Sequence, residues 1–251
     1  MEIKEDTSAN LERVVLVDAS ELRDLDKFIK PETVIEIIDH RKVNDAAFFK
    51  NAKIQIELVG SAATLIAEKF YMNKIEISRD AATLLYGAII SNTLNFRSKN
   101  TTDRDRRMAE WLNKKFKFPQ TFADDMFRAK SDVAAEKLAQ RIEADFAWFA
   151  FGIRKIGFAQ LEIMDAKIVA ETRKTEIFNI LNTLKTKENL DDIFISLIDL
   201  GAGYNIFIAE NPSMQSILAN ILGVMFQDDI ATRPGFMMRK EITPLLREKL
   251  G

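Results

Sequence analysis

"TVIEIIDHR", residues 33–41, is an apolar, β-branched run that ends in an acid, a histidine and an arginine. An earlier run of the same kind, "RVVLVDAS" (13–20), also ends in an acid. Between them, "SELRDLDKFIKPE" (20–32) has room for a short helix that ends before Pro31. Strand, helix and strand in this order predict a βαβ unit, and the continuous apolar runs indicate parallel strands covered on both faces.

Polar residues follow both predicted strands at their carboxyl ends. They are Asp18 after the first strand, and Asp39 and His40, the single histidine of the chain, after the second. In parallel sheets ligands bind at these strand ends, and carboxylate with imidazole can hold a divalent metal. Asp39 could orient the imidazole. The alternative is a loop histidine bonded to the backbone, because two acids and one histidine do not by themselves define a metal site.

The rest of the first half predicts further α/β structure. "KIQIELVGSAATLIAEKFY" (53–71) indicates a strand that ends at Gly60 and a helix capped by Ser61, whose amides could hold an anion. "ISRDAATLLYGAIISNTLNF" (77–96) predicts a helix from Ser78, with Asn92 at its far end. "KFKFPQTFADD" (115–125) is the predicted linker, so that one domain covers residues 1–117 and another covers 122–251.

The second half predicts a smaller α/β domain. We expect helix over 125–149, strand over 154–165, one long helix over 166–190, two strands at 192–200 and 204–211, and helix over 213–226.

Composition limits the classes of function. The formal net charge is −2 and 47% of residues are hydrophobic, which is typical of a globular protein without a strong attraction for nucleic acid. The basic segment 104–117 is interpreted as a solvated helix face. Cysteine is absent, which excludes disulfides and thiolate chemistry. With an acidic, polar N-terminus and no apolar run long enough for a bilayer, we expect no membrane segment and a cytoplasmic location.

The order of segments carries a family resemblance. "LVDAS", "IDHR", "ELVGSAATLIAE" and "LLYGAIISNTLNF" with "TTDRDRRMAEWL" resemble the catalytic domain of the DHH phosphoesterases. They are most similar to the family II, manganese-dependent inorganic pyrophosphatases and their prune-like relatives. "MFRAKSDV", "ADFAWF", "RKIGFAQLEIMD" and "PGFMMRKEITPLL" resemble the companion DHHA2 domain. The resemblance implies an α/β chain with a parallel-sheet DHH domain, shortened at its N-terminus, followed by a smaller α/β DHHA2 domain.

The resemblance also implies a chemistry and assigns roles. Members hydrolyse a phosphoanhydride, here pyrophosphate or short polyphosphate, with Mn²⁺ (Mg²⁺ as the alternative). Asp18 matches the catalytic aspartate that bridges metals, His40 the catalytic metal-binding histidine, and Asp39 its supporting acid. Arg239 and Lys240 match a basic pair that grips substrate phosphates across an interdomain cleft.

Four departures from the family pattern affect these roles. Arg41 replaces a second histidine, where it could still bind phosphate, and Asn92 replaces a metal-binding aspartate, leaving a neutral third ligand. Ala147 replaces a phosphate-binding lysine. "MEIKEDTSANLE" (1–12) lacks the histidine and Asp-x-Asp of the family's first strand. We therefore expect at most one ion, and an open sheet edge that favours a partner such as a homodimer.

Three hypotheses of function remain at this stage. The first is a metal-dependent pyrophosphatase, with a related substrate such as a small phosphodiester left open. The second is a catalytically impaired pseudoenzyme that binds phosphate, nucleotide or a protein partner, which the changes at positions 41, 92 and 147 favour. The third is an α/β domain pair whose polar strand ends have no remaining role.

Overall fold

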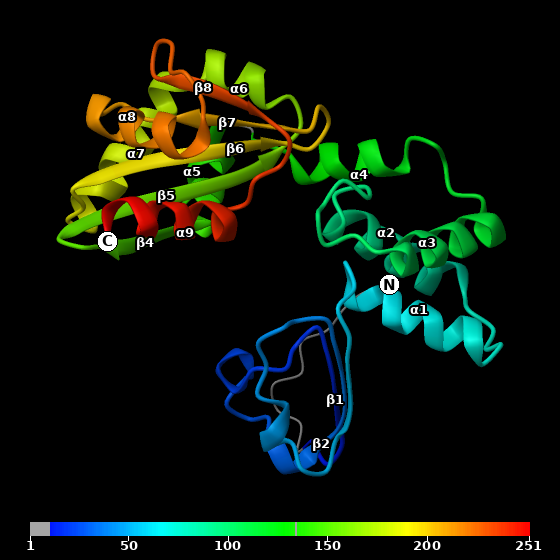
Figure 1. Cartoon of the computed structure of the whole chain (residues 1–251). Coiled ribbons are helices and arrows are strands. Elements are labelled where there is room, and N and C mark those ends of the chain that lie inside the picture. Colours follow the sequence, from blue (N-terminus) through cyan, green and yellow to red (C-terminus); the bar gives the residue numbers. More distant parts are fainter. Residues whose placement is uncertain (1–10, 134) are drawn as a thin grey trace. The chain divides into compact units, whose positions relative to one another are not determined.

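The computed structural model describes residues 11–133 and 135–251, so most of the segment 1–12 discussed above lies outside the described residues. The chain divides into two compact units, one ending at Ala123 and the other beginning at Asp124 (Figure 1).

The first unit is built on a three-stranded parallel sheet in the order β1-β2-β3. Its strands are β1 (Val14–Val17), β2 (Val34–Asp39) and β3 (Lys53–Ile56). Leu16 and Ile37 pair in register and pack into one apolar core. This sheet confirms the parallel α/β class, and it brings the carboxyl ends of β1 and β2 side by side.

Three α-helices complete the first unit. They are α1 (Ala62–Met72), α2 (Arg79–Asn92) and α3 (Asp103–Phe116). The hydroxyls of Ser61, Ser78 and Thr102 accept hydrogen bonds from the first turns, as expected of N-caps. Asp105 is fully buried and accepts hydrogen bonds from Gly60 at the start of α1. A Cβ on Gly60 would lie 2.7 Å from a Thr93 methyl group, so this close approach requires glycine.

The α-helix predicted between β1 and β2 is wrong. The structure has only two 3-10 turns there, Leu22–Asp24 and Pro31–Thr33. The carboxylate of Asp45 accepts the Leu22 amide at 2.9 Å, and so short a segment gains too few helical hydrogen bonds to offset nucleation.

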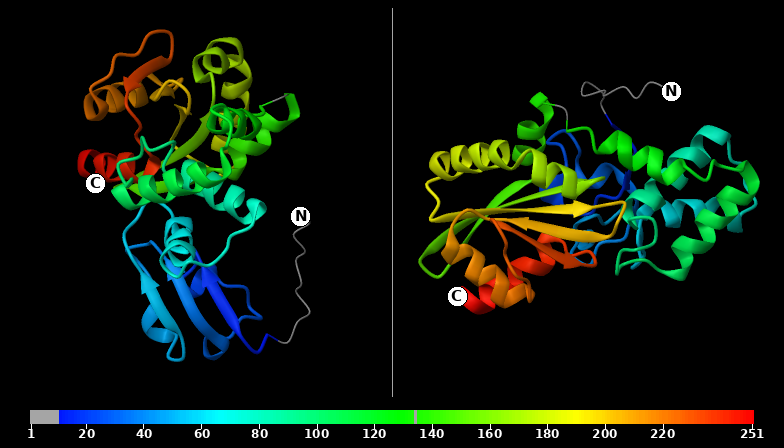
Figure 2. Two further views of the ribbon diagram at one scale, coloured as in Figure 1. Left: turned by 90° about the vertical axis from the view of Figure 1, so that its right-hand side faces the viewer. Right: turned by 90° about the horizontal axis from the view of Figure 1, so that it is seen from above.

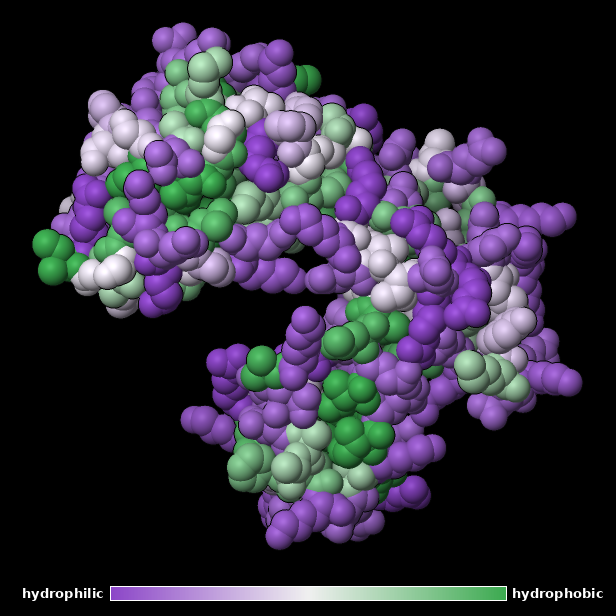
Figure 3. Space-filling view, in the orientation of Figure 1, coloured by the Kyte–Doolittle hydropathy of each residue, from purple (hydrophilic) through white to green (hydrophobic). Residues whose placement is uncertain are grey.

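The open side of the first sheet shows apolar side chains at the surface. Among residues 11–133, β1 is an edge strand, and Val15 and Val17 are each 48% exposed. Apolar groups are visible among polar ones on this unit in Figure 3.

The second unit contains a five-stranded mixed sheet in the order β4-β5-β6-β7-β8. The strands are β4 (Phe146–Phe151), β5 (Arg154–Ile163), β6 (Asp192–Asp199), β7 (Tyr204–Ile208) and β8 (Ile230–Pro234). Only β5 and β6 pair in parallel, and their crossover runs through α6 (Ala166–Thr172) and α7 (Lys174–Lys187). The remaining helices are α4 (Phe122–Lys130), α5 (Ala135–Ala144), α8 (Pro212–Leu222) and α9 (Arg239–Leu250).

Both faces of this sheet are covered, which explains the continuous apolar runs of its central strands. Side chains such as Leu161 of β5 pack with α5, α6 and α7 on one face. Phe158 and Phe194 pack with α8 and α9 on the other face. Figure 2 shows α7 on one side of the sheet and α8 and α9 on the other.

Several boundaries predicted for the second unit are wrong. The helix predicted over 125–149 is α4, α5 and the strand β4: the Ser131 hydroxyl donates to the Phe127 carbonyl oxygen at the end of α4, and residues 146–151 pair with β5. The long helix over 166–190 breaks at Arg173, whose φ is −119°. Gly223 ends α8 in a left-handed conformation, and β8 was not predicted.

No helix among the described residues is long and apolar enough to cross a bilayer.

Candidate functional site

Asp18 follows β1 directly and turns its carboxylate towards β2. Its backbone adopts a left-handed φ of 57°, and its amide donates to the Ile38 carbonyl at 2.9 Å. Aspartate tolerates this conformation better than most residues, and strained backbone of this kind concentrates at functional sites.

His40 follows β2 and is fixed by hydrogen bonds at two points. Its amide donates to Asp39 Oδ1 at 2.6 Å, and its Nδ1 lies 2.8 Å from the Val59 carbonyl oxygen. A carbonyl oxygen only accepts, so Nδ1 carries the proton. Nε2 therefore points to Asp18, whose Oδ1 lies 3.3 Å away. Metal-binding histidines are oriented in the same way, with one nitrogen bound to a carbonyl or carboxylate and the other presented to the ion.

Asp39 supports this arrangement from the interior. Its side chain is 0% exposed; one oxygen accepts from the Ser20 hydroxyl and the other from the amides of His40 and Arg41. These bonds fix the strand end that carries His40.

The electrostatics of the pair favour charge on both partners. The hydrogen bond that His40 donates to the Asp18 carboxylate raises the pKa of His40 more than burial lowers it, and the Val59 carbonyl adds to the increase. The hydrogen bond from His40, with its charge and that of Arg41, lowers the pKa of Asp18 against the opposing effect of burial. An electropositive group beside the Asp18 carboxylate is therefore stabilised.

Asp18, Asp39 and His40 form a candidate cation site. One donor atom from each lies within 4.8 Å of the others, and within residues 11–133 and 135–251 no other group of three or more acids and histidines is so close. Oxygen and imidazole nitrogen donors suit Mn²⁺, Co²⁺ and related ions.

Arg41 and Asn92, the other two predicted site residues of the first unit, make hydrogen bonds of their own. The guanidinium of Arg41 donates to the Asp18 carbonyl oxygen at 2.5 Å and lies 3.8 Å from Glu21. Asn92 ends α2, and its side-chain amide donates to the Ser61 hydroxyl at 3.1 Å. No hydrogen bond in the described part of the chain joins Asn92 to Asp18 or His40.

Arg239 begins α9 in the second unit and is held by several groups. Its guanidinium pairs with Asp145 and donates to the carbonyl oxygens of Asp145 at 2.8 Å and Phe158 at 3.3 Å. Its amide donates to Gln160 at 2.7 Å. The side chain is consequently oriented by the protein itself.

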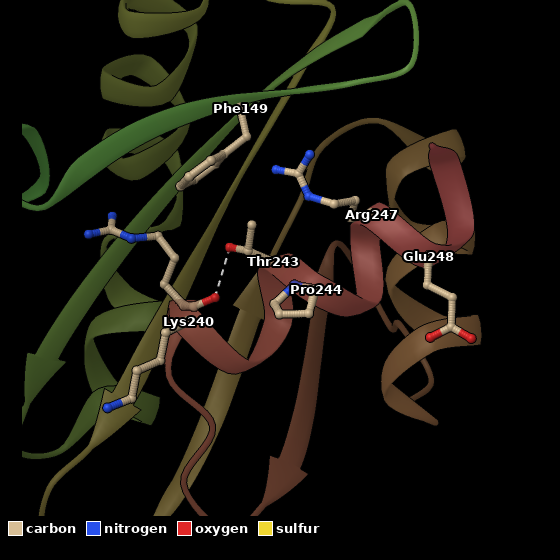
Figure 4. A pocket seen from close by; sticks show the side chains of 7 residues that line it. Phe149, Lys240, Thr243, Pro244, Arg247 and Glu248 are labelled. Atoms are coloured by element: carbon tan, nitrogen blue, oxygen red, sulfur yellow. Dashed lines mark hydrogen bonds between the residues drawn. The ribbon is translucent and has the colours of Figure 1, made fainter. Parts of the chain in front are cut away.

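Lys240 is exposed and lines a cavity of about 720 Å³. The cavity lies between β4 and α9 (Figure 4), and its lining residues are Phe149, Arg239, Lys240, Thr243, Pro244, Arg247 and Glu248. Ala147, on β4, presents no polar side-chain group. The sequence analysis did not identify Phe149 or Arg247 as site residues. For Arg247, the four-residue spacing of Arg239, Thr243 and Arg247 along one face of a helix could have indicated it. Ser20, the buried partner of Asp39, was also missed.

Comparison with known proteins identifies the domain family of the second unit. Residues 124–249 match the model of the DHHA2 domain. The chain is similar to a manganese-dependent inorganic pyrophosphatase of Methanocaldococcus jannaschii, with 31% identity over 97% of this chain and 82% of the relative. It is 34% identical to one from Methanothrix thermoacetophila over 75% of this chain, and 31% identical to a cobalt-dependent inorganic pyrophosphatase of Clostridium perfringens over 96%. The matches span 60% and 44% of the lengths of these two relatives.

A solved structure is similar over the whole chain. A family II inorganic pyrophosphatase from Methanococcus jannaschii has a TM-score of 0.70 and 29% identity, covering 100% of this chain and 84% of the other.

Proposed function

Because the chain belongs to the family II, manganese-dependent inorganic pyrophosphatases, we propose that it takes part in metal-dependent hydrolysis of inorganic pyrophosphate to phosphate. The pairing of Asp18 with His40 supports this most. His40 Nε2 lies 3.3 Å from Asp18 Oδ1, while His40 Nδ1 is bonded to the Val59 carbonyl oxygen. Histidines that bind metal are oriented in this way, and ligands of parallel sheets bind at the carboxyl ends of the strands.

The donor set fits one Mn²⁺ ion. Asp18 offers a carboxylate oxygen and His40 offers Nε2, and both lie in the group whose donor atoms are within 4.8 Å. We assign Asn92 as a third ligand, through an amide oxygen that its bond to Ser61 leaves available. A bound divalent ion would supply Lewis acidity for a phosphoryl oxygen and for the attacking water. Asp39 would stay outside the direct ligands, since its oxygens already accept bonds from Ser20 and two amides.

The remaining residues would bind and orient the substrate. Arg41, Arg239 and Lys240 supply cations for phosphoryl oxygens, and a guanidinium can donate to two oxygens at once. Pyrophosphate carries several negative charges, so these contacts neutralise it and fix its orientation.

A second candidate function is binding without efficient catalysis. Three positions favour it: Asn92 offers only a neutral amide, the Arg41 guanidinium already donates to the Asp18 carbonyl oxygen, and Ala147 on β4 offers no polar side-chain group. In this alternative the chain binds a phosphate-bearing ligand.

Phosphate release from pyrophosphate tests the proposal. The chain would be assayed with Mn²⁺ and, separately, with Co²⁺, beside Asp18→Asn, His40→Ala and the control Asp26→Asn, an exposed acid of the same unit. Metal-dependent release that is lost in the first two variants and kept in the control supports hydrolysis at this site. Release equal in all variants, or none above the metal blank from folded protein, overturns it. In the latter case, calorimetric binding of pyrophosphate weakened by Lys240→Gln would support the second candidate.

A further inference from the structure

The cavity on the second unit is longer than a pyrophosphate ion requires. Arg239, Thr243 and Arg247 recur every fourth residue, so they form one stripe along α9. The two arginines are separated by about 12 Å along the helix axis. Phe149 faces this stripe from β4 (Figure 4). The volume of about 720 Å³ lies in the range of cavities that hold drug-sized organic ligands.

Charge is distributed unevenly along the cavity. Within the described residues, neither Lys240 nor Arg247 has a carboxylate at ion-pair distance, whereas Arg239 is paired with Asp145. Lys240 lies at the N-terminal end of α9, where the helix dipole also favours an anion. Glu248 is the one acid in the lining, and it lies about two turns further along the helix. The Lys240 end is therefore the better position for phosphate.

The other end offers contacts for a planar, weakly polar group. Phe149 is partly exposed, and the ring of Pro244 and the methyl group of Thr243 lie on the opposing helix. The Thr243 hydroxyl is already donated to the Arg239 carbonyl oxygen at 2.8 Å, which leaves its methyl group for the ligand. Aromatic side chains bind nucleobases by stacking, and guanidinium groups can stack on or donate to base edges.

We propose that this cavity binds a nucleoside di- or triphosphate, with the phosphates at Lys240 and Arg239 and the base between Phe149 and Arg247. The phosphate end of this assignment rests on the proposed function, and the base end rests on the cavity itself. The inference extends the ligand class from inorganic pyrophosphate to an organic phosphoanhydride.

The test is calorimetric binding of ADP and of pyrophosphate to the full chain in EDTA, which removes any contribution from metal. Phe149→Ala should weaken ADP binding by about 5- to 150-fold, the range for loss of one base-stacking contact. Phe149→Leu keeps an apolar side chain without the aromatic face, so its affinity should lie between those of the parent chain and Phe149→Ala. Arg247→Gln should weaken ADP binding by about tenfold. None of these changes should alter pyrophosphate binding by more than about twofold.

Two neighbouring residues serve as controls. Trp148 precedes Phe149 and projects from the other face of β4, where Lys155 lies over its ring. Lys249 is an exposed cation of α9 that lies outside the cavity lining. Trp148→Ala and Lys249→Gln should therefore bind ADP as the parent chain does. Thermal melts establish that each variant is folded.

The outcomes separate this inference from the proposed function. Three outcomes would overturn the nucleotide site. They are no ADP binding, ADP binding no tighter than that of pyrophosphate, and ADP binding that Phe149→Ala leaves unchanged in folded protein. Pyrophosphate hydrolysis that requires Asp18 and His40 stands or falls in its own assay. Hydrolysis without Phe149-dependent ADP binding therefore overturns only the inference, and the reverse result overturns only the proposed hydrolysis.

Discussion

His40 Nε2 lies 3.3 Å from Asp18 Oδ1, at the ends of two strands that pair in parallel. The other ring nitrogen is bound to the Val59 carbonyl, so the imidazole cannot turn away without losing that hydrogen bond. Asp39 and Ser20 hold the adjoining backbone from a buried position. The pair is thus oriented before any ion arrives, which reduces the entropy lost on binding.

One Mn²⁺ per chain is the first expectation. Asp39 is engaged at the strand end, which leaves Asp18, His40 and the proposed Asn92 as ligands, and so small a set cannot hold two ions. Calorimetric titration should give a stoichiometry near one, and Asp18→Asn or His40→Ala should weaken binding by about 100-fold or more. A stoichiometry of two, or full affinity in either variant, would contradict this assignment.

Asp105 should contribute more to stability than its neighbour Asp103. Its buried carboxylate accepts from the Gly60 amide at 2.9 Å, the Thr64 hydroxyl at 2.5 Å and the Thr102 amide at 2.7 Å. Asp105→Asn replaces one acceptor by a donor facing these donors, and we expect a loss of about 2–4 kcal/mol in the free energy of unfolding. Asp103→Asn, exposed in the same helical turn, should cost less than about 1 kcal/mol. Urea unfolding measures both, and equal losses would refute the role of Asp105.

Local patterns predicted the strand ends but not the groups that complete the sites. The apolar runs before Asp18 and Asp39 have the composition of buried parallel strands, so β1, β2 and the position of His40 could be read from the sequence. The strand β4 was interpreted as helix, because its apolar residues continue an amphipathic run and its extended conformation depends on antiparallel pairing with β5. Such pairing depends on a second segment and leaves no signal in the strand's own residues.

The same limit applies to the cavity on α9. Phe149 and Arg247 line the same cavity because α9 packs against β4, although about 100 residues separate them in the sequence. Arg239 was assigned to phosphate by family resemblance alone, and its pairing with Asp145 depends on the same packing.

Removal of the Asp145 charge should strengthen pyrophosphate binding. The carboxylate neutralises Arg239, but two backbone carbonyl oxygens, at 2.8 and 3.3 Å, would still hold the guanidinium in Asp145→Asn. We expect binding about fivefold tighter at low salt, since about 1 kcal/mol of repulsion between the carboxylate and the ligand is lost. The gain should shrink at high salt, where such charges are screened. Calorimetry at two salt concentrations tests this, with exposed Glu171→Gln as the control; weaker binding in Asp145→Asn would show that the carboxylate orients Arg239 instead.

Glu162 on β5 should make the second unit less stable at neutral pH than in mild acid. Burial raises the pKa of its carboxyl group, Asp145 adds to the increase, and Lys130 and Arg141 oppose it. A carboxyl group whose pKa is higher in the folded than in the unfolded state binds more protons when folded. Its contribution to stability is therefore fully present below the unfolded pKa and is lost as pH rises through the folded pKa.

Glu162→Gln removes this dependence, because the amide stays neutral at every pH. Its free energy of unfolding should exceed that of the parent chain at about pH 8, and the difference should vanish towards about pH 4, where the parent carboxyl group is also neutral. Glu143→Gln, an exposed acid on α5, should follow the parent chain throughout. Urea unfolding across this pH range gives the comparison. A gain at the higher pH that persists unchanged at the lower one would mean that the amide stabilises by packing, and no gain at the higher pH would mean that Lys130 and Arg141 already offset the cost of burying the charge.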